Sequence, residues 1–218
     1  MNVKLQELLR VIIPKEIRLF LWRIVPKIHI VNTYILTKPK LICNPQRIES
    51  KYSINEISQT DKEQLIKVYR YRGSNSYSEQ ILPRLLSNDW IGLAVFDNAN
   101  GNIAYIAWII IRSIRYFEEF GVHLKPRQFL LKDGFCVPEY RHQGLHTRME
   151  QERINYCVRN NADTIFIQIL NSNKKGIDSV INNGYVLYNQ RKIIQWSLFG
   201  VYRELWSFLR SPFRKIVK

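Results

Sequence analysis

The chain has 218 residues, of which 33 are Lys or Arg and 18 are Asp or Glu, so its formal net charge is +15. This length is enough for one well-packed α/β domain. Its three cysteines lack metal-ligand spacing and argue against a zinc site and a disulfide framework, which favours reduced thiols in the cytoplasm. No apolar run is long enough to span a bilayer, and the first 15 residues lack the cleavage site of a signal peptide.

The residue pattern predicts alternating strands and helices over most of the chain. Apolar or alternating segments predict strands over 51–57, 90–96, 103–114, 129–137 and 163–170, and a last strand through 187–188. Amphipathic spacing and turn residues predict helices over 60–72, 78–86 and 145–158, and a short one that ends near residue 182. Ahead of these elements, an extra strand is expected over 29–36 and a linker over 37–47.

Basic residues are concentrated at the two ends. Near the N-terminus, apolar residues recur with helical spacing at Ile17, Phe20, Leu21, Ile24, Val25 and Ile28. A second apolar stripe near the C-terminus comprises Val201, Leu205, Phe208 and Leu209. Basic amphipathic segments of this kind suit an anionic membrane surface, and packing on the core or in a homodimer contact is the alternative. Nucleic acid is the least favoured partner, because aliphatic residues interrupt the basic ones.

The most informative segment is the predicted strand 129–137 with the turn and helix that follow it. The strand ends before Pro138, and the turn carries Arg141-x-x-Gly144 before the helix that begins at Leu145. The first N–H groups of a helix have no partner within it, and the helix dipole adds about half a positive charge there. Since Gly144 has no Cβ, the backbone can approach a phosphate closely. The segment therefore predicts an anion-binding site.

Residues 135–149 resemble motif A of the GCN5-related N-acetyltransferase (GNAT) superfamily, in which a strand ending Val-x-Pro precedes Arg-x-x-Gly. Downstream, Asn173, Gly176, Gly184 and Tyr185 lie at the positions of motif B. The resemblance implies an α/β (α+β) fold with a mixed, mostly antiparallel sheet of six to seven strands and about four helices. The acyltransferase domain would span residues 50–199, with a basic amphipathic extension over 1–49 and a basic tail over 200–218.

The resemblance also implies acetyl-coenzyme A as co-substrate and no metal. The strands ending near residues 137 and 170 would part to admit the pantetheine arm, and a strand N–H would polarise the thioester carbonyl. The residues expected to bind the coenzyme are Phe135, Val137, Arg141, His142, Gln143, Gly144, Leu145, His146, Thr147 and Asn173. Two positions depart from the family pattern: His146 replaces a small residue, and Val180 replaces a tyrosine that protonates the leaving thiolate in many relatives.

Three residues are candidates for catalysis. Asp133 is the first choice for the base that takes the proton of the acceptor, and the alternative is a solvated carboxylate in a bend or bulge with Gly134. Tyr185 could replace the missing acid, as could Tyr188 or water. His123 lies in a loop that could line the acceptor site, although a surface histidine is the more common outcome. An acyl-cysteine at Cys136 is not expected, because no histidine partner is evident.

Two functional hypotheses follow from the resemblance. The first is a cytoplasmic, membrane-peripheral acyltransferase whose acceptor attacks acetyl-coenzyme A directly in a ternary complex. Its acceptor would be a small molecule or glycan, such as an amino sugar, or a lipid- or polymer-linked intermediate at the membrane face. The alternative is a non-catalytic coenzyme-binding or interaction module with the same fold. No motif in the sequence identifies the acceptor or decides between an amine and a hydroxyl.

Overall fold

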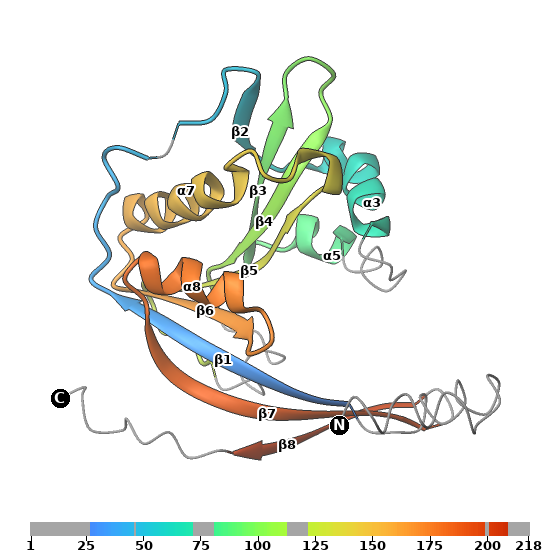
Figure 1. Ribbon diagram of the computed structural model, residues 1–218, viewed down its shortest axis with the longest axis vertical. Coiled ribbons are helices and arrows are strands. Elements are labelled where there is room, and N and C mark those ends of the chain that lie inside the picture. The colour runs from blue at the N-terminus through green and yellow to red at the C-terminus, as the bar shows by residue number, and fades with distance from the viewer. Residues whose placement is uncertain (1–26, 46, 72–80, 113–121, 199–200, 209–218) are drawn as a thin grey trace.

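The computed structural model describes residues 27–45, 47–71, 81–112, 122–198 and 201–208 (Figure 1). Most of the predicted N-terminal amphipathic helix and Leu209 of the C-terminal stripe lie outside these residues. The described strands form one sheet of eight in the order β2-β3-β4-β5-β6-β1-β7-β8. Neighbouring strands are antiparallel except for β5 and β6, which are parallel. The predicted mixed, mostly antiparallel fold is thus confirmed, with one strand more than expected.

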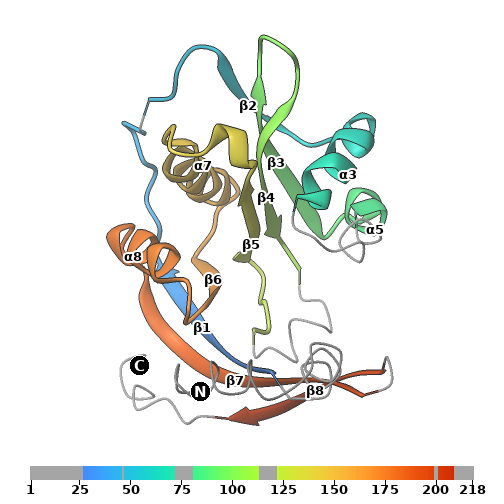
Figure 2. The ribbon, with the colours of Figure 1, turned by 45° about the vertical axis from the view of Figure 1, so that its right-hand side comes forward.

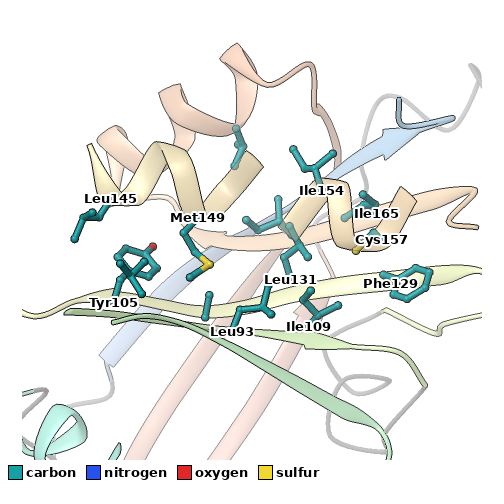
Figure 3. Packing of buried hydrophobic residues seen from close by; sticks show 14 of the residues in the cluster. Leu93, Tyr105, Ile109, Phe129, Leu131, Leu145, Met149, Ile154, Cys157 and Ile165 are labelled. Carbon is teal, nitrogen blue, oxygen red and sulfur yellow. The ribbon is translucent and has the colours of Figure 1, made fainter. Parts of the chain in front are cut away.

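The helices cover the sheet on both faces (Figures 1 and 2). On one face lie α7 (Leu145–Arg159) and α8 (Lys174–Asn182), and on the other lie α3 (Lys62–Arg70) and α5 (Ile81–Leu86). The central strand β4 (Ile103–Ile110) is buried along its whole length, which explains its unbroken apolar sequence. Figure 3 shows the core beneath α7, where Leu145, Met149 and Ile154 face the side chains of the sheet.

The predicted elements of residues 50–182 are present with small shifts at their ends. The strands are β2 (Tyr52–Glu56), β3 (Trp90–Asp97), β4, β5 (Gln128–Cys136) and β6 (Thr164–Leu170). The first helix begins at Lys62, after a 3₁₀ turn (Gln59–Asp61). The side chain of Asp61 accepts a hydrogen bond from the Ser58 N–H at 2.8 Å, so Ser58 caps the 3₁₀ turn, and Asp61 is the N-cap residue of α3.

The expected extra strand is β1 (Lys27–Thr37), and it lies inside the sheet. It pairs with β6 through Val31–Thr37 and with β7 (Val186–Leu198) through Lys27–Ile35. The strand β7 is much longer than predicted and pairs with β8 (Val201–Phe208), which includes most of the C-terminal apolar stripe. The sheet therefore contains strands from all three expected parts of the chain. The limits of the acyltransferase domain at residues 50 and 199 remain a prediction.

Candidate functional site

A slot opens in the sheet between β5 and β6. The two strands pair from Gln128 and Thr164 to Leu131 and Ile167, and beyond that rung each continues without pairing to the other. The resulting cavity of about 330 Å³ is lined by residues of β5, β6, α7 and α8. The parting of these strands lies where the resemblance to GNAT proteins implies room for the pantetheine arm.

A β-bulge in β5 forms one wall of the slot. Trp108 pairs with Lys132 and Ile106 pairs with Phe135, so β5 has one residue more than β4 over this interval. The extra residue lies at Asp133-Gly134, where Asp133 adopts a φ of 51°. Beyond the bulge the Val137 N–H donates to the carbonyl of Ala104 at 3.0 Å. Since N–H groups alternate along a strand, the N–H of Cys136 is directed away from β4, toward the slot.

The turn after β5 brings a helix N-terminus to the end of the slot. Residues Pro138–Tyr140 form a 3₁₀ turn, and His142 and Gly144 have φ values of 63° and 73°. The first bond of α7 runs from the Arg148 N–H to the Gly144 carbonyl at 3.1 Å. The N–H groups of residues 145–147 therefore precede the hydrogen-bond ladder and are available to an anion.

Side chains in this turn are fixed to different degrees. The Tyr52 hydroxyl donates to Gln143 Oε1 at 2.5 Å, which anchors the turn to β2. Arg141 Nε donates to the Cys136 carbonyl at 3.4 Å, while His142 is exposed. Phe135 and Val137 pack on the α3 side of the sheet, so they contribute backbone rather than side chains to the slot. Thr147 is partly exposed in the first turn of α7.

Asn173 lines the opposite side of the slot at the start of α8. Its side-chain oxygen accepts a hydrogen bond from the Gly176 N–H at 3.0 Å, so it caps the helix. A Cβ on Gly176 would lie 2.6 Å from Asn173 Nδ2, which explains the glycine of motif B as a packing requirement.

The Cys136 thiol is not suited to act as a nucleophile. Burial raises its pKa, an effect that Arg141 partly offsets, and an un-ionised thiol is a poor nucleophile.

Solved structures with this arrangement of strands and helices include GNAT proteins. A tandem GNAT protein from the clavulanic acid biosynthesis pathway matches 81% of this chain and 56% of its own, at 12% identity and a TM-score of 0.59. A putative GNAT acetyltransferase from Novosphingobium aromaticivorans matches 79% of this chain and 65% of its own, at 14% identity and a TM-score of 0.55. The chain has the GNAT fold.

A conserved protein of unknown function from Staphylococcus epidermidis is also similar in fold to this chain. It matches 90% of this chain and 68% of its own, at 15% identity and a TM-score of 0.57. No protein-family model and no curated protein matches the sequence. The chain spans little more than half of the tandem protein's length, and at these identities the likeness is one of fold.

On the α5 side of the slot between β5 and β6, Asp133 forms an ion pair with Arg84 rather than being solvated. Its carboxylate lies 2.6 Å from Arg84 Nη1, and its side chain is 16% exposed. The Arg84 guanidinium lies 4.4 Å above the Trp90 ring and 5.5 Å from that of Trp108, and Nη1 donates to the Tyr69 hydroxyl at 3.1 Å. The predicted alternative for Asp133 was therefore right about the bulge and wrong about the carboxylate, because α5 supplies a cation there.

A buried ion pair that the sequence did not reveal lies under the slot. Glu150 and Arg153, one turn apart on α7, are paired, with side chains 4% and 2% exposed, and both line the cavity. Arg153 Nη1 also donates to the carbonyls of Lys132 at 3.3 Å and Trp108 at 3.5 Å, a pair of residues at one side of the bulge. Burial opposes the charge of Arg153, but Glu150, together with Tyr105 and Tyr185, outweighs this effect and raises the pKa of the guanidinium.

Tyr185 and His123 are not among the residues that line the slot between β5 and β6. Tyr185 is 3% exposed within the core, and burial raises the pKa of its phenol well above the usual value. His123 is exposed, and its neighbours Val122 and Leu124 pack near the first residues of β5, at the far end of that strand from Val137. The roles predicted for these two residues remain predictions, with no support from their positions.

His146 lines the slot and contacts Tyr105, a second residue that was not identified from the sequence. The Tyr105 hydroxyl, carried by β4, lies 2.7 Å from His146 Nδ1, and Tyr105 is 1% exposed. A Cβ on Gly134 would lie only 2.7 Å from that hydroxyl. The alternation of β4 could have placed Tyr105 on the α7 face, but its closeness to His146 depends on the packing of α7 on the sheet.

Proposed function

We propose that the chain is an acyltransferase that moves an acetyl group from acetyl-coenzyme A to an amine or hydroxyl acceptor. The observation that carries the proposal is the slot between β5 and β6, which has a bulge in its wall and the start of α7 at its end. Within the described residues no group of His, Cys, Asp and Glu could hold a metal ion. The proposed reaction requires none, since the acceptor attacks the thioester directly.

The coenzyme would be held mainly by backbone groups. Its pyrophosphate would bind the N–H groups of residues 145–147, where the helix dipole favours an anion. The pantetheine arm would follow β5 toward the bulge, and Asn173 would border it from α8. The Cys136 N–H, directed into the slot, would donate to the thioester oxygen as negative charge develops on it.

Asp133 would accept the proton of the attacking group. It is the carboxylate at the bulge, and Arg84 holds it on the α5 side of the sheet. The coenzyme would approach from the side of the pyrophosphate turn, so an acceptor entering beside α5 would meet the carboxylate next to the thioester. An amine acceptor is mostly protonated at neutral pH and must lose that proton before it attacks.

The proposed acceptor is an amino sugar, or a lipid- or polymer-linked intermediate reached at the inner face of the membrane. This part rests on the basic, apolar composition of the two ends of the chain. None of the described helices is long and apolar enough to cross a membrane. The proposed attachment is peripheral, at the cytoplasmic face, through residues 1–26.

The test is release of free coenzyme A from acetyl-coenzyme A with a panel of amino sugars and their hydroxyl analogues. Acceptor-dependent release by the full chain, lost in Asp133→Asn, is the expected result. Tight binding of acetyl-coenzyme A without transfer to any member of the panel would favour the alternative, a non-catalytic coenzyme-binding module.

A further inference from the structure

Acyl transfer from a thioester leaves a thiolate, and the slot lacks a tyrosine in α8 to protonate it. Val180 lines the slot from α8 and is 2% exposed. A hydroxyl does reach the same cavity wall from β4. Tyr105 extends beneath β5 so that its oxygen lies 2.7 Å from the position that a Cβ of Gly134 would occupy. Gly134 itself lines the slot at the bulge.

The absence of a side chain at Gly134 is therefore what leaves space beside the Tyr105 hydroxyl. Arg153 Nη2 lies 3.7 Å from the same Cβ position, so the bulge is bordered by a phenol and a guanidinium. In Figure 3, Tyr105 lies under the first turn of α7, below Leu145 and Met149.

His146 connects this buried hydroxyl to solvent. Its Nδ1 lies 2.7 Å from the Tyr105 oxygen, and the residue is exposed in the first turn of α7. When the imidazole carries protons on both nitrogens, its Nδ1–H donates to the phenol oxygen and the phenol proton can be directed elsewhere. The pair thus has the arrangement of a two-step proton relay from water to the slot.

We infer that Tyr105 is the group that protonates the leaving thiolate, with His146 as its proton source. The inference rests on the proposed acyl-transfer function. As the bond between the carbonyl carbon and sulfur breaks, its electron pair stays on sulfur, and the Tyr105 O–H proton moves to it. The His146 Nδ1–H proton then passes to the phenolate oxygen, and the imidazole recovers a proton from water. The products are the acylated acceptor and the free thiol of coenzyme A.

Tyr185, the tyrosine favoured by the sequence, is a weaker candidate on this geometry. Both tyrosines belong to the buried core and neither is among the residues that line the cavity, but the Tyr105 hydroxyl lies against Gly134 and His146, which do line it. The two tyrosines also differ in access to protons. Tyr105 contacts an exposed histidine, and the Tyr185 hydroxyl is buried without a hydrogen-bond partner among the described residues.

The test needs no acceptor, because coenzyme A itself carries the sulfur. Binding of coenzyme A and of desulfo-coenzyme A is measured by calorimetry at pH 9.5, where an ordinary thiol is mainly ionised. A hydrogen bond to a charged group contributes enough to change affinity by roughly tenfold or more. The full chain is expected to bind coenzyme A about tenfold more tightly than the desulfo form. In Tyr105→Phe this preference should fall below about twofold, with desulfo-coenzyme A bound as before.

Two further variants keep the result interpretable. Tyr34→Phe removes another hydroxyl from the same buried cluster and is expected to retain the sulfur preference. Gly134→Ala fills the space beside the Tyr105 hydroxyl and is expected to lose it. Equal weakening of both ligands in Tyr105→Phe, or no change in either, would overturn the assignment of Tyr105. Failure of the unmodified chain to bind either ligand would instead overturn the proposed function, and this inference with it.

Discussion

Removal of one partner of the buried Glu150–Arg153 pair should severely destabilise the fold. Both side chains are almost completely inaccessible, and Arg153 also donates to two carbonyls at one side of the bulge. Arg153→Met keeps most of the side-chain volume but leaves the Glu150 carboxylate buried without its cation. It also removes the donor for the Lys132 and Trp108 carbonyls.

The expected loss in the free energy of unfolding is about 4 kcal/mol. Breaking a buried ion pair by removing one partner typically costs about 3–5 kcal/mol, because the remaining charge is uncompensated. The two carbonyl contacts are long, at 3.3 and 3.5 Å, and add little to that figure. The double variant Glu150→Leu/Arg153→Met removes both charges and should lose about 1 kcal/mol or less, since apolar replacement of a buried pair is often neutral.

Urea unfolding at pH 7, followed by tryptophan fluorescence, measures these differences. The slope of free energy against urea should be the same in all variants, so the midpoints report stability directly. For a chain of this size the single variant should melt roughly 8–16 °C lower. A loss under about 1 kcal/mol in Arg153→Met, or a double variant as unstable as the sum of the two single variants, would refute the picture of a mutually dependent buried pair.

Three further predictions follow from the described contacts and the sequence. Asp133→Asn should lower turnover by about 10²–10⁴ with unchanged affinity for acetyl-coenzyme A, and an unaltered pH–rate profile would rule out Asp133 as the base. Burial raises the pKa of the Cys157 thiol to about 12, so the native state keeps its proton while the unfolded chain loses it above about pH 9. The stability of the unmodified chain relative to Cys157→Ala should therefore fall by about 1.4 kcal/mol per pH unit from pH 9 toward 12; parallel pH curves for the two proteins would contradict this. Deletion of residues 1–26 should abolish sedimentation with anionic vesicles, and salt should weaken that of the full chain; equal binding to neutral vesicles would argue against an electrostatic contact.

Local patterns in the sequence were sufficient to predict the segment that forms the slot. The strand, turn and helix over residues 129–158 are encoded by an apolar run, a proline, a glycine and an amphipathic stretch, all within 30 residues. Each of these patterns determines the backbone conformation of its own residues, without contacts to distant parts of the chain. For the same reason the bulge at Asp133-Gly134 could be foreseen as one of two alternatives.

Contacts between distant segments could not be predicted from local sequence patterns. The position of β1 between β6 and β7 depends on which strands it meets, and its own apolar pattern is compatible with an edge strand as well. Arg84 lies on a short helix whose orientation sets its contact with Asp133, and Tyr105 meets His146 only after α7 packs on the sheet. Apolar residues at 201, 205 and 208 suggested a stripe, but pairing with β7 makes this segment a strand.

The central claim is that the start of α7 and the slot beside it bind acetyl-coenzyme A. Calorimetric titration of the full chain and of Gly144→Trp with acetyl-coenzyme A tests it most directly, with an unrelated nucleotide as a ligand control. Gly101→Trp is the matched protein control: Gly101 has a φ of 68°, close to the 73° of Gly144, but lies in the β3–β4 turn with open space around it. Selective micromolar binding by the full chain and by Gly101→Trp, lost in Gly144→Trp, is the predicted result. Undiminished binding in Gly144→Trp, or none in the folded full chain, would contradict it.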